Sequence, residues 1–257
     1  MITIISPATT MNFEKVNNNI SNSNPYFNKE VNYLSGILKD LNKNQVSKLM
    51  KLSDDLAILN LDRYKVLGTD ESPYLQSILA FNGHVFNAMN IDDFNEIDFE
   101  FANNHLRVLS GLYGVLKPFD LIQPYRLEMK SKLENNLGND LYKFWKDKIT
   151  SFLYDDLSKQ KSKILINLAS SEYSKAINFK VLAKDFNIIN VEFKELKKES
   201  NTYKVIGTYS KKARGQLSSY IIKNKIDDIE NLKKFNSDGY KFNDSLSDIN
   251  NFIFTRQ

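Results

Sequence analysis

The 257-residue sequence contains no cysteine. This absence excludes disulfide bonds, thiolate metal sites and iron–sulfur clusters, and the protein can be neither a thiol peroxidase nor a thiol-based redox sensor. No apolar run approaches the roughly 20 residues that cross a bilayer. The first residues, MITIISPATT, also lack the charged and apolar regions of a secretory signal. We therefore expect a cytoplasmic protein with no membrane contact and no disulfide partner.

Histidine and the common cofactor motifs are also scarce. Only His84 and His105 are present, and their spacing does not suggest a pair of metal ligands. The sequence has no phosphate-binding P-loop, no GxGxxG fingerprint and no nucleophile elbow. We therefore predict no metal site and no cofactor.

Charge is present but unevenly distributed. The segment from Lys194 to Lys225 holds nine Lys or Arg residues and two Glu residues, a local charge of +7, while the whole chain carries +4. A basic segment on an acidic remainder can bind a polyanion, although a solvated lysine-rich face has the same composition. Hydrophobic residues make up 42% of the chain, which is enough for a sizeable core. No repeat or linker divides the sequence, so a single domain over residues 1–257 is expected.

Three short apolar runs predict buried strands at residues 2–6, 106–110 and 164–170. Between them, apolar residues recur at spacings of three and four, which predicts helices at 26–41, 45–64, 70–89 (with a break near residues 82–83) and 92–105. Residues 189–196 and 202–210 predict a further strand pair. Strands separated by helices indicate an α/β fold, with a mixed, mainly parallel central sheet flanked by helices in one compact domain.

Each of the three predicted strands ends in a serine that is followed by Pro, Gly or a second Ser. Ligands bind at the carboxyl ends of parallel strands, so the segments SPA, SGLYG and SSEY would share one edge if the strands are neighbours. One hypothesis is an enzyme that acts on a nucleotide or a nucleic-acid base there, with Ser6, Ser170 and Glu172 as catalytic candidates. Ser-Ser-Glu is common as a helix cap, and that interpretation is favoured over catalysis.

The segment LSGLYGVLKP, residues 109–118, contains two glycines three positions apart. Its apolar-x-Gly-apolar-x-Gly pattern is that of a helix-hairpin-helix element, in which Gly111 and Gly114 would expose backbone N–H groups to a DNA phosphate and Lys117 would reinforce the contact. A tight structural turn after a strand has the same glycines.

Two further basic sites are candidates for phosphate contact. Arg126 follows Pro124 and Tyr125 directly, and its planar guanidinium matches a phosphate or a carboxylate, so a bridge to Glu128 or Asp120 is the alternative. Beyond it, YSKKARGQLSSYII places Lys211, Lys212 and Arg214 at the expected start of a helix. A bound polyanion would offset the unfavourable helix dipole at that place.

Taken together, six segments resemble the YaaA peroxide-stress protein family in order and approximate spacing. These are ISPATT, LSGLYGVLKPFDLIQPYRLEM, LYKFW (141–145), INLASSEY (166–173), KKARG (211–215) and FNSDGY (235–240). The resemblance implies a cytoplasmic bacterial protein that limits hydrogen peroxide damage and is linked indirectly to lower free intracellular iron. It further implies binding to double-stranded DNA through a basic cleft with a helix-hairpin-helix-like element. Separately, we expect the protein to be a monomer.

Residue by residue, the resemblance assigns DNA contact to seven positions: Gly111, Gly114, Lys117, Arg126, Lys211, Lys212 and Arg214. One departure concerns the first motif, where the family usually has Ser-Pro-Ala-Lys-Thr and this chain has Thr9. If that lysine contacts phosphate in relatives, this chain lacks the contact unless Lys15 replaces it. A bound nucleotide or a deep polar pocket would favour the enzyme hypothesis, whereas a flat basic groove would not.

Overall fold

A computed structural model describes residues 1–14, 20–197 and 199–257 of the chain. Its centre is an eight-stranded sheet in the order β4-β3-β1-β6-β7-β10-β9, with β8 paired to β7. Five adjacent strands are parallel: β3 (Leu106–Ser110), β1 (Ile2–Ile5), β6 (Ile164–Asn167), β7 (Asn187–Lys197) and β10 (Asn251–Arg256). The other three are antiparallel: β4 (Gly114–Leu116), β8 (Thr202–Lys204) and β9 (Lys241–Phe242). The predicted mixed, mainly parallel sheet is confirmed.

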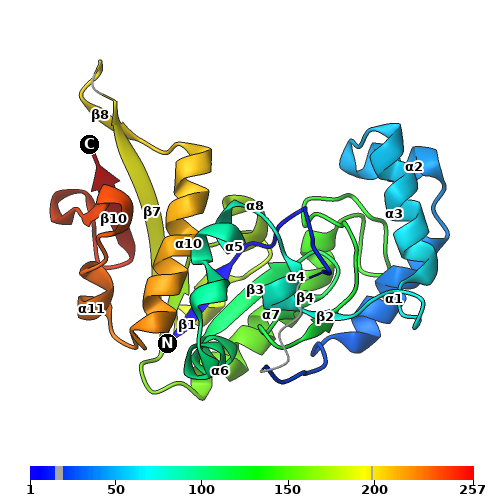
Figure 1. Ribbon diagram of the computed structural model, residues 1–257, viewed down its shortest axis with the longest axis horizontal. Helices are drawn as coiled ribbons and strands as arrows, with labels where there is room; N and C mark the ends of the chain where they lie inside the picture. The colour runs from blue at the N-terminus through cyan, green and yellow to red at the C-terminus, as the bar shows by residue number, and fades with distance from the viewer. Residues whose placement is uncertain (15–19, 198) are drawn as a thin grey trace.

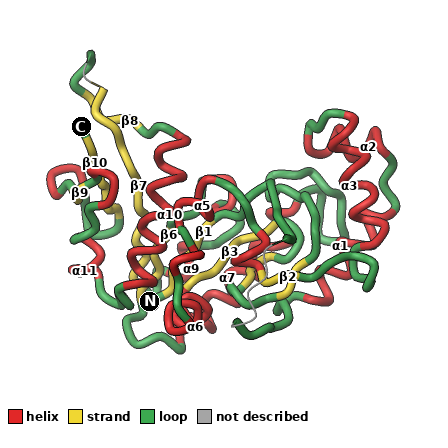
Figure 2. Tube along the Cα trace, in the orientation of Figure 1, coloured by secondary structure: helices red, strands yellow, loops and turns green. Residues whose placement is uncertain are grey.

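Helices surround this sheet and form an additional group at one end of the molecule. In Figure 1, α1, α2 and α3 gather at one end, and β7, β8 and β10 lie with α11 at the other. Loops connect much of the region between α1–α3 and the central strands (Figure 2). The helices are α1 (Asn28–Lys39), α2 (Lys43–Met50), α3 (Asp54–Val66), α4 (Ser77–Ala80), α5 (His84–Met89), α6 (Glu96–His105), α7 (Leu141–Ser158), α8 (Ser171–Ser174), α9 (Phe179–Leu182), α10 (Gly207–Lys223) and α11 (Ile229–Lys233). A separate two-stranded sheet pairs β2 (Leu75–Gln76) with β5 (Leu121–Ile122).

The central strands are buried on both faces. Every residue of β1, β3 and β6 is buried, as expected where helices cover both sides of a parallel sheet. Because neither face of these strands is exposed to solvent, apolar and polar residues do not alternate along them. Continuous apolar runs such as ITII therefore identify these strands in the sequence. The three predicted strands are confirmed, and they are direct neighbours.

Several predicted helices differ from the observed ones at their ends. The helix expected at 45–64 is two helices, because Lys51 adopts the left-handed conformation that ends α2. The segment 70–89 breaks near Asn82–Gly83 as predicted, but it begins with β2 and not with a helix. The strand expected at 202–210 ends at Lys204, and α10 begins at Gly207. Burial of Ala213, Leu217 and Ile221 along one face of α10 outweighs the local β propensity.

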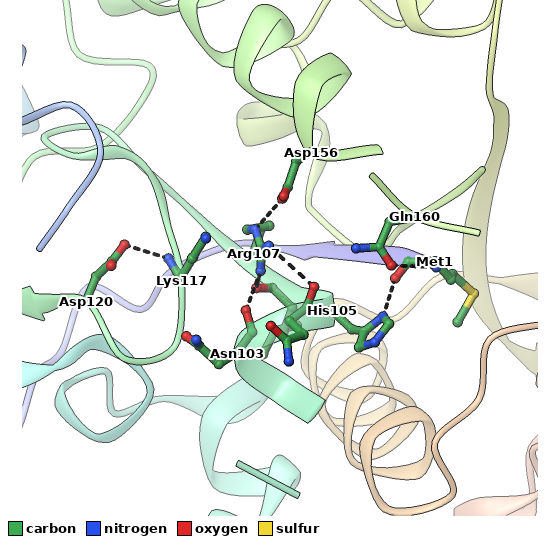
Figure 3. A network of polar contacts seen from close by, with 10 residues as sticks. Met1, Asn103, His105, Arg107, Lys117, Asp120, Asp156 and Gln160 are labelled. Carbon is green, nitrogen blue, oxygen red and sulfur yellow. Dashed lines mark hydrogen bonds and ion pairs between the residues drawn. The ribbon is translucent and has the colours of Figure 1, made fainter. Parts of the chain in front are cut away.

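A buried ion pair attaches β3 to α7 (Figure 3). Nε of Arg107 donates to Oδ2 of Asp156 at 2.6 Å, and the Arg107 side chain is only 2% exposed. The same guanidinium donates through NH1 to the backbone carbonyls of Asn103 and Leu106 at 2.8 and 2.6 Å. The charge is thus both paired and hydrogen-bonded, which is the condition under which a protein interior accommodates it.

Candidate functional site

A polar pocket of 710 Å³ opens at the carboxyl ends of β1 and β6. We call it the strand-end pocket. Its wall combines five segments: residues 6–10 after β1, residues 82–87 at the start of α5, Glu128 with Lys130, Ser170 with Glu172 and Tyr173 at α8, and Lys211 with Arg214 on α10. SPA and SSEY meet at this sheet edge as predicted, but SGLYG, itself among the described residues, contributes none of the residues that line the pocket.

Two serines join the strand ends at the base of this pocket. The backbone N–H of Ser170 donates to Oγ of Ser6 at 2.9 Å, and the Ser6 hydroxyl donates to Oγ of Ser170 at 3.2 Å. Each side chain is half-buried. Within the described residues, neither hydroxyl has a histidine or a carboxylate as its hydrogen-bond partner, so the activated nucleophile of a serine–base pair is not assembled here.

Beside the serines, Lys130 lies between two carboxylates. Its Nζ is 2.7 Å from Oε2 of Glu128 and 3.4 Å from Oε2 of Glu172. Burial acts to raise the pKa of Glu128, but hydrogen bonds from Lys130 and Arg126 outweigh it and hold that pKa below its usual range. The hydrogen bond to Glu128 raises the pKa of Lys130 in turn. Both groups are therefore ionised at neutral pH.

The pocket lining also includes two cations from α10, Lys211 and Arg214. Lys211 is exposed and Arg214 is half-buried, and within the described part of the chain no carboxylate lies at ion-pair distance from either. Burial lowers the pKa of Arg214, against the opposing charge of Glu192. Its Nε is buried and has no hydrogen-bond partner among the described residues. Gly215 lets α10 approach α5 closely, because a Cβ there would lie 2.0 Å from the carbonyl oxygen of Val85.

The predicted helix-hairpin-helix is not formed by residues 109–118. Gly111 and Gly114 lie in a buried turn between the antiparallel strands β3 and β4. A Cβ at Gly111 would lie 2.3 Å from the carbonyl oxygen of Leu127, and one at Gly114 would lie 2.6 Å from the ring of Trp145. Close packing, together with a positive φ at Gly114, therefore accounts for both glycines. The alternative interpretation, a tight structural turn after a strand, agrees with the structure.

Lys117 lies away from the strand-end pocket. Because β4 runs antiparallel to β3, its last residue Leu116 is level with Val108, and Lys117 follows toward the amino ends of the parallel strands. There its backbone N–H donates to Asp120 at 2.8 Å (Figure 3), and the residue lines a different pocket of 330 Å³. Lys117 and Arg214 therefore do not share one surface.

The remaining predicted contacts are engaged in ion pairs. Arg126 donates to Glu128 at 2.9 Å, which is the bridge weighed as the alternative to phosphate binding. Lys212 lies 3.1 Å from Asp238, whose carboxylate also pairs with Arg256. Both Lys211 and Lys212 belong to the second turn of α10 and not to its first residues. Lys15 lies outside the described residues.

Sequence reasoning missed Glu128 and Lys130 as site residues. Glu128 is the second-last residue of the distinctive segment LSGLYGVLKPFDLIQPYRLEM, and Lys130 directly follows that segment. Their closeness in sequence to Arg126 was the signal that could have identified them. His84 lines the pocket, whereas Nδ1 of His105 contacts the carbonyl oxygen of Met1 at 2.8 Å (Figure 3). Over residues 1–14, 20–197 and 199–257, no three His, Asp or Glu side chains are placed to hold one metal ion. No helix in these ranges is long and apolar enough to span a membrane.

The fold and the pocket define an α/β protein with a ligand-sized site at the carboxyl edge of its parallel strands. Comparison with known sequences extends this description. A sequence model of the family described as peroxide stress protein YaaA matches residues 1–246. A UPF0246 protein of Clostridium botulinum (strain Eklund 17B / Type B) is 43% identical over 256 residues, covering 99% of both chains.

Similar proteins occur in other bacteria. A UPF0246 protein of Saccharophagus degradans is 44% identical over 259 residues, and one of Clostridium perfringens is 42% identical over 260 residues, each covering 100% of both chains. The chain therefore belongs to the peroxide stress protein YaaA family. This membership is consistent with a role in peroxide stress.

Proposed function

We propose that this protein binds DNA at the strand-end pocket, and that this binding is its part in the peroxide response of the family. Lys211 and Arg214 contact backbone phosphates at the pocket mouth, and a single nucleotide enters the space between α10 and the serines. The pocket volume of 710 Å³ is within the range of sites that enclose small ligands.

The observation that carries this proposal is the state of the two cations on α10. Surface lysines and arginines that lie near carboxylates pair with them, as Lys212 does with Asp238 at 3.1 Å. In the described ranges, Lys211 and Arg214 have no such partner although both line the pocket. Among the described residues, the guanidinium of Arg214 has no hydrogen-bond acceptor. Its Nε is fully enclosed, so a phosphate would be bound through the two terminal nitrogens.

A phosphate at this place is also compatible with the two carboxylates of the pocket lining. Glu128 and Glu172 are both paired with Lys130, so their charges are partly neutralised before any ligand arrives. The family's usual lysine in the first motif is Thr9 here, and Thr9 is exposed at the pocket rim. Binding in this chain therefore rests on α10 more than on the strand end.

The test is fluorescence anisotropy with a labelled DNA duplex across a salt series. Each phosphate contact contributes about 0.9 to the slope of log affinity against log salt concentration. We expect the Lys211→Gln/Arg214→Gln variant to bind more weakly and to lose roughly two units of that slope. Lys212→Gln is the matched control on the same helix, because its ammonium group already pairs with Asp238.

Lys211→Gln alone keeps the test valid if the double variant does not fold, since Lys211 is exposed. Circular dichroism would check the fold of each variant. A slope that is equal in wild type and in both variants would place the duplex elsewhere on the molecule. An absence of binding by wild type at low salt would contradict DNA binding itself.

A second candidate function is an enzyme that acts on a nucleotide or a nucleic-acid base in the same pocket. The observation that favours it is the pocket itself, since the enzyme hypothesis requires a pocket and a flat basic groove would not support it. Ser6, Ser170 and Glu172 share its lining with the two cations of α10. Calorimetry with mononucleotides would test it. Binding of a free mononucleotide that Glu172→Gln alters, without any binding of duplex DNA, would favour this function over the first.

A further inference from the structure

A second pocket, of 820 Å³, lies between α1, α2 and residues 128–134. We call it the lysine-rimmed pocket. Its apolar surface is contributed by five side chains: Ile37, Leu41, Leu49, Met50 and Leu133. Three of these, Ile37, Leu41 and Leu49, are only half-buried, so the pocket presents hydrocarbon surface to solvent at the end of the molecule formed by α1–α3 (Figure 1).

The rim of this pocket is basic. Lys48, Lys51 and Lys132 line it, all three are exposed, and within the described ranges none of them pairs with a carboxylate. Of the two carboxylates in the wall, Glu128 is already bound by Lys130 and Arg126. Glu134 is the other, and its side chain is exposed.

We propose that the lysine-rimmed pocket binds a fatty acid. The hydrocarbon chain lies on the apolar surface, and the carboxylate meets the lysines of the rim. An apolar surface alone would accept many ligands, but three lysines in its lining that are unpaired within the described ranges are complementary to an amphiphile with one anionic end. The volume is within the range of small-ligand sites.

The apolar surface of this pocket favours a fatty acid over a nucleic acid as its ligand. A DNA backbone gains its affinity from charge and needs no hydrocarbon wall, whereas a fatty acid gains affinity from each methylene group that leaves water. The inference does not rest on DNA binding at the strand-end pocket. The two pockets meet only at Glu128 and Lys130, which line both.

Isothermal titration calorimetry of the full chain with decanoate would test the proposal. Octanoate, butyrate and 1-decanol serve as comparison ligands. Removing two methylene groups should weaken binding on the order of tenfold, because each buried methylene contributes roughly fourfold. We therefore expect decanoate to bind more tightly than octanoate and butyrate not to bind. The uncharged 1-decanol should bind more weakly than decanoate at low salt.

Two variants separate the rim from the apolar surface. Lys48→Gln/Lys51→Gln/Lys132→Gln should weaken decanoate on the order of tenfold and leave 1-decanol unchanged. Leu41→Gln, in the connection between α1 and α2, should weaken both ligands. Lys161→Gln/Lys180→Gln/Lys184→Gln is the matched control, since these lysines are exposed and line neither pocket. The proposal would be overturned if wild type did not bind decanoate, or if it bound butyrate as tightly as decanoate. It would also be overturned if the control variant lost as much affinity for decanoate as the Lys48/Lys51/Lys132 variant does.

Discussion

Nζ of Lys130 lies 2.7 Å from Oε2 of Glu128, and this ion pair forms part of the wall of two pockets. The other carboxylate oxygen accepts a hydrogen bond from Arg126 at 2.9 Å, so Glu128 is held by two cations. Lys130 also approaches Glu172 across the strand-end pocket. The position of the pocket wall therefore depends on the charge of one buried carboxylate.

Glu128→Gln should destabilise the protein at neutral pH by roughly 1 to 2 kcal/mol, because two charge-assisted hydrogen bonds are weakened. The pKa of Glu128 is held below its usual value of 4.5, so its contribution to stability is present above that pH and is lost as the pH falls through the lower folded-state pKa. Urea unfolding of both proteins between pH 7 and pH 3.5 would measure this. The difference in unfolding free energy should be constant down to about pH 5 and shrink below it. A difference that does not change with pH would contradict this account of Glu128.

Gly215→Ala should cost about 1 to 3 kcal/mol of unfolding free energy. The added Cβ would lie 2.0 Å from the carbonyl oxygen of Val85, so α10 would have to move away from α5. Gly207→Ala is the control on the same helix, since no atom lies within 4 Å of its added Cβ. Urea denaturation should give a control as stable as wild type or slightly more stable. Equal stability of the two variants would show that α5 and α10 are not held at this distance.

Gly114→Ala should destabilise the protein by more than Gly68→Ala does. Both glycines have a positive φ, +71° and +83°, so alanine pays a similar conformational cost at each. At Gly114 the new methyl group would also meet the ring of Trp145, at 2.6 Å, whereas a Cβ added at Gly68 would have no other atom within 4 Å among the described residues. The difference between the variants in thermal or urea unfolding therefore measures the packing of the β3–β4 turn. Equal losses would mean that Trp145 can move aside.

Asp156→Ala should destabilise the protein by about 3 to 5 kcal/mol, because it leaves the buried guanidinium of Arg107 without its counter-charge. Replacing both residues, in Arg107→Met/Asp156→Leu, should cost less than the Asp156→Ala change alone, since no unpaired charge remains. Urea unfolding of the single and double variants tests this. A double variant much less stable than Asp156→Ala would mean that the hydrogen bonds from Arg107 to the carbonyls of Asn103 and Leu106 outweigh the ion pair.

The central sheet could be predicted because its strands are continuous apolar runs. Residues 2–6, 106–110 and 164–170 needed no long-range information to be identified, and parallel pairing then placed Ser6 beside Ser170. Helix ends were predicted less well. The left-handed Lys51 that separates α2 from α3 has no sequence signature, since glycine or asparagine is usual at that position.

The glycine segment was misassigned for a different reason. Gly111 and Gly114 fit a hairpin between helices as well as a turn between strands, and only the packing of Leu127 and Trp145 against them distinguishes the two. The sequence identified the basic residues of α10, but it did not indicate which of them form ion pairs. Asp238 is 26 residues from Lys212, so their ion pair depends on tertiary structure alone.

The absence of cysteine makes one measurement especially direct, since a single introduced thiol can carry a fluorescent label. Thr9→Cys places the label at the exposed rim of the strand-end pocket, and Lys161→Cys places it before β6, at the opposite edge of the sheet. Duplex DNA added at low salt should change the emission of the label at position 9, with the same midpoint as anisotropy, and leave the label at position 161 unchanged. Binding by anisotropy with no change at position 9 would contradict the proposal that DNA reaches this pocket.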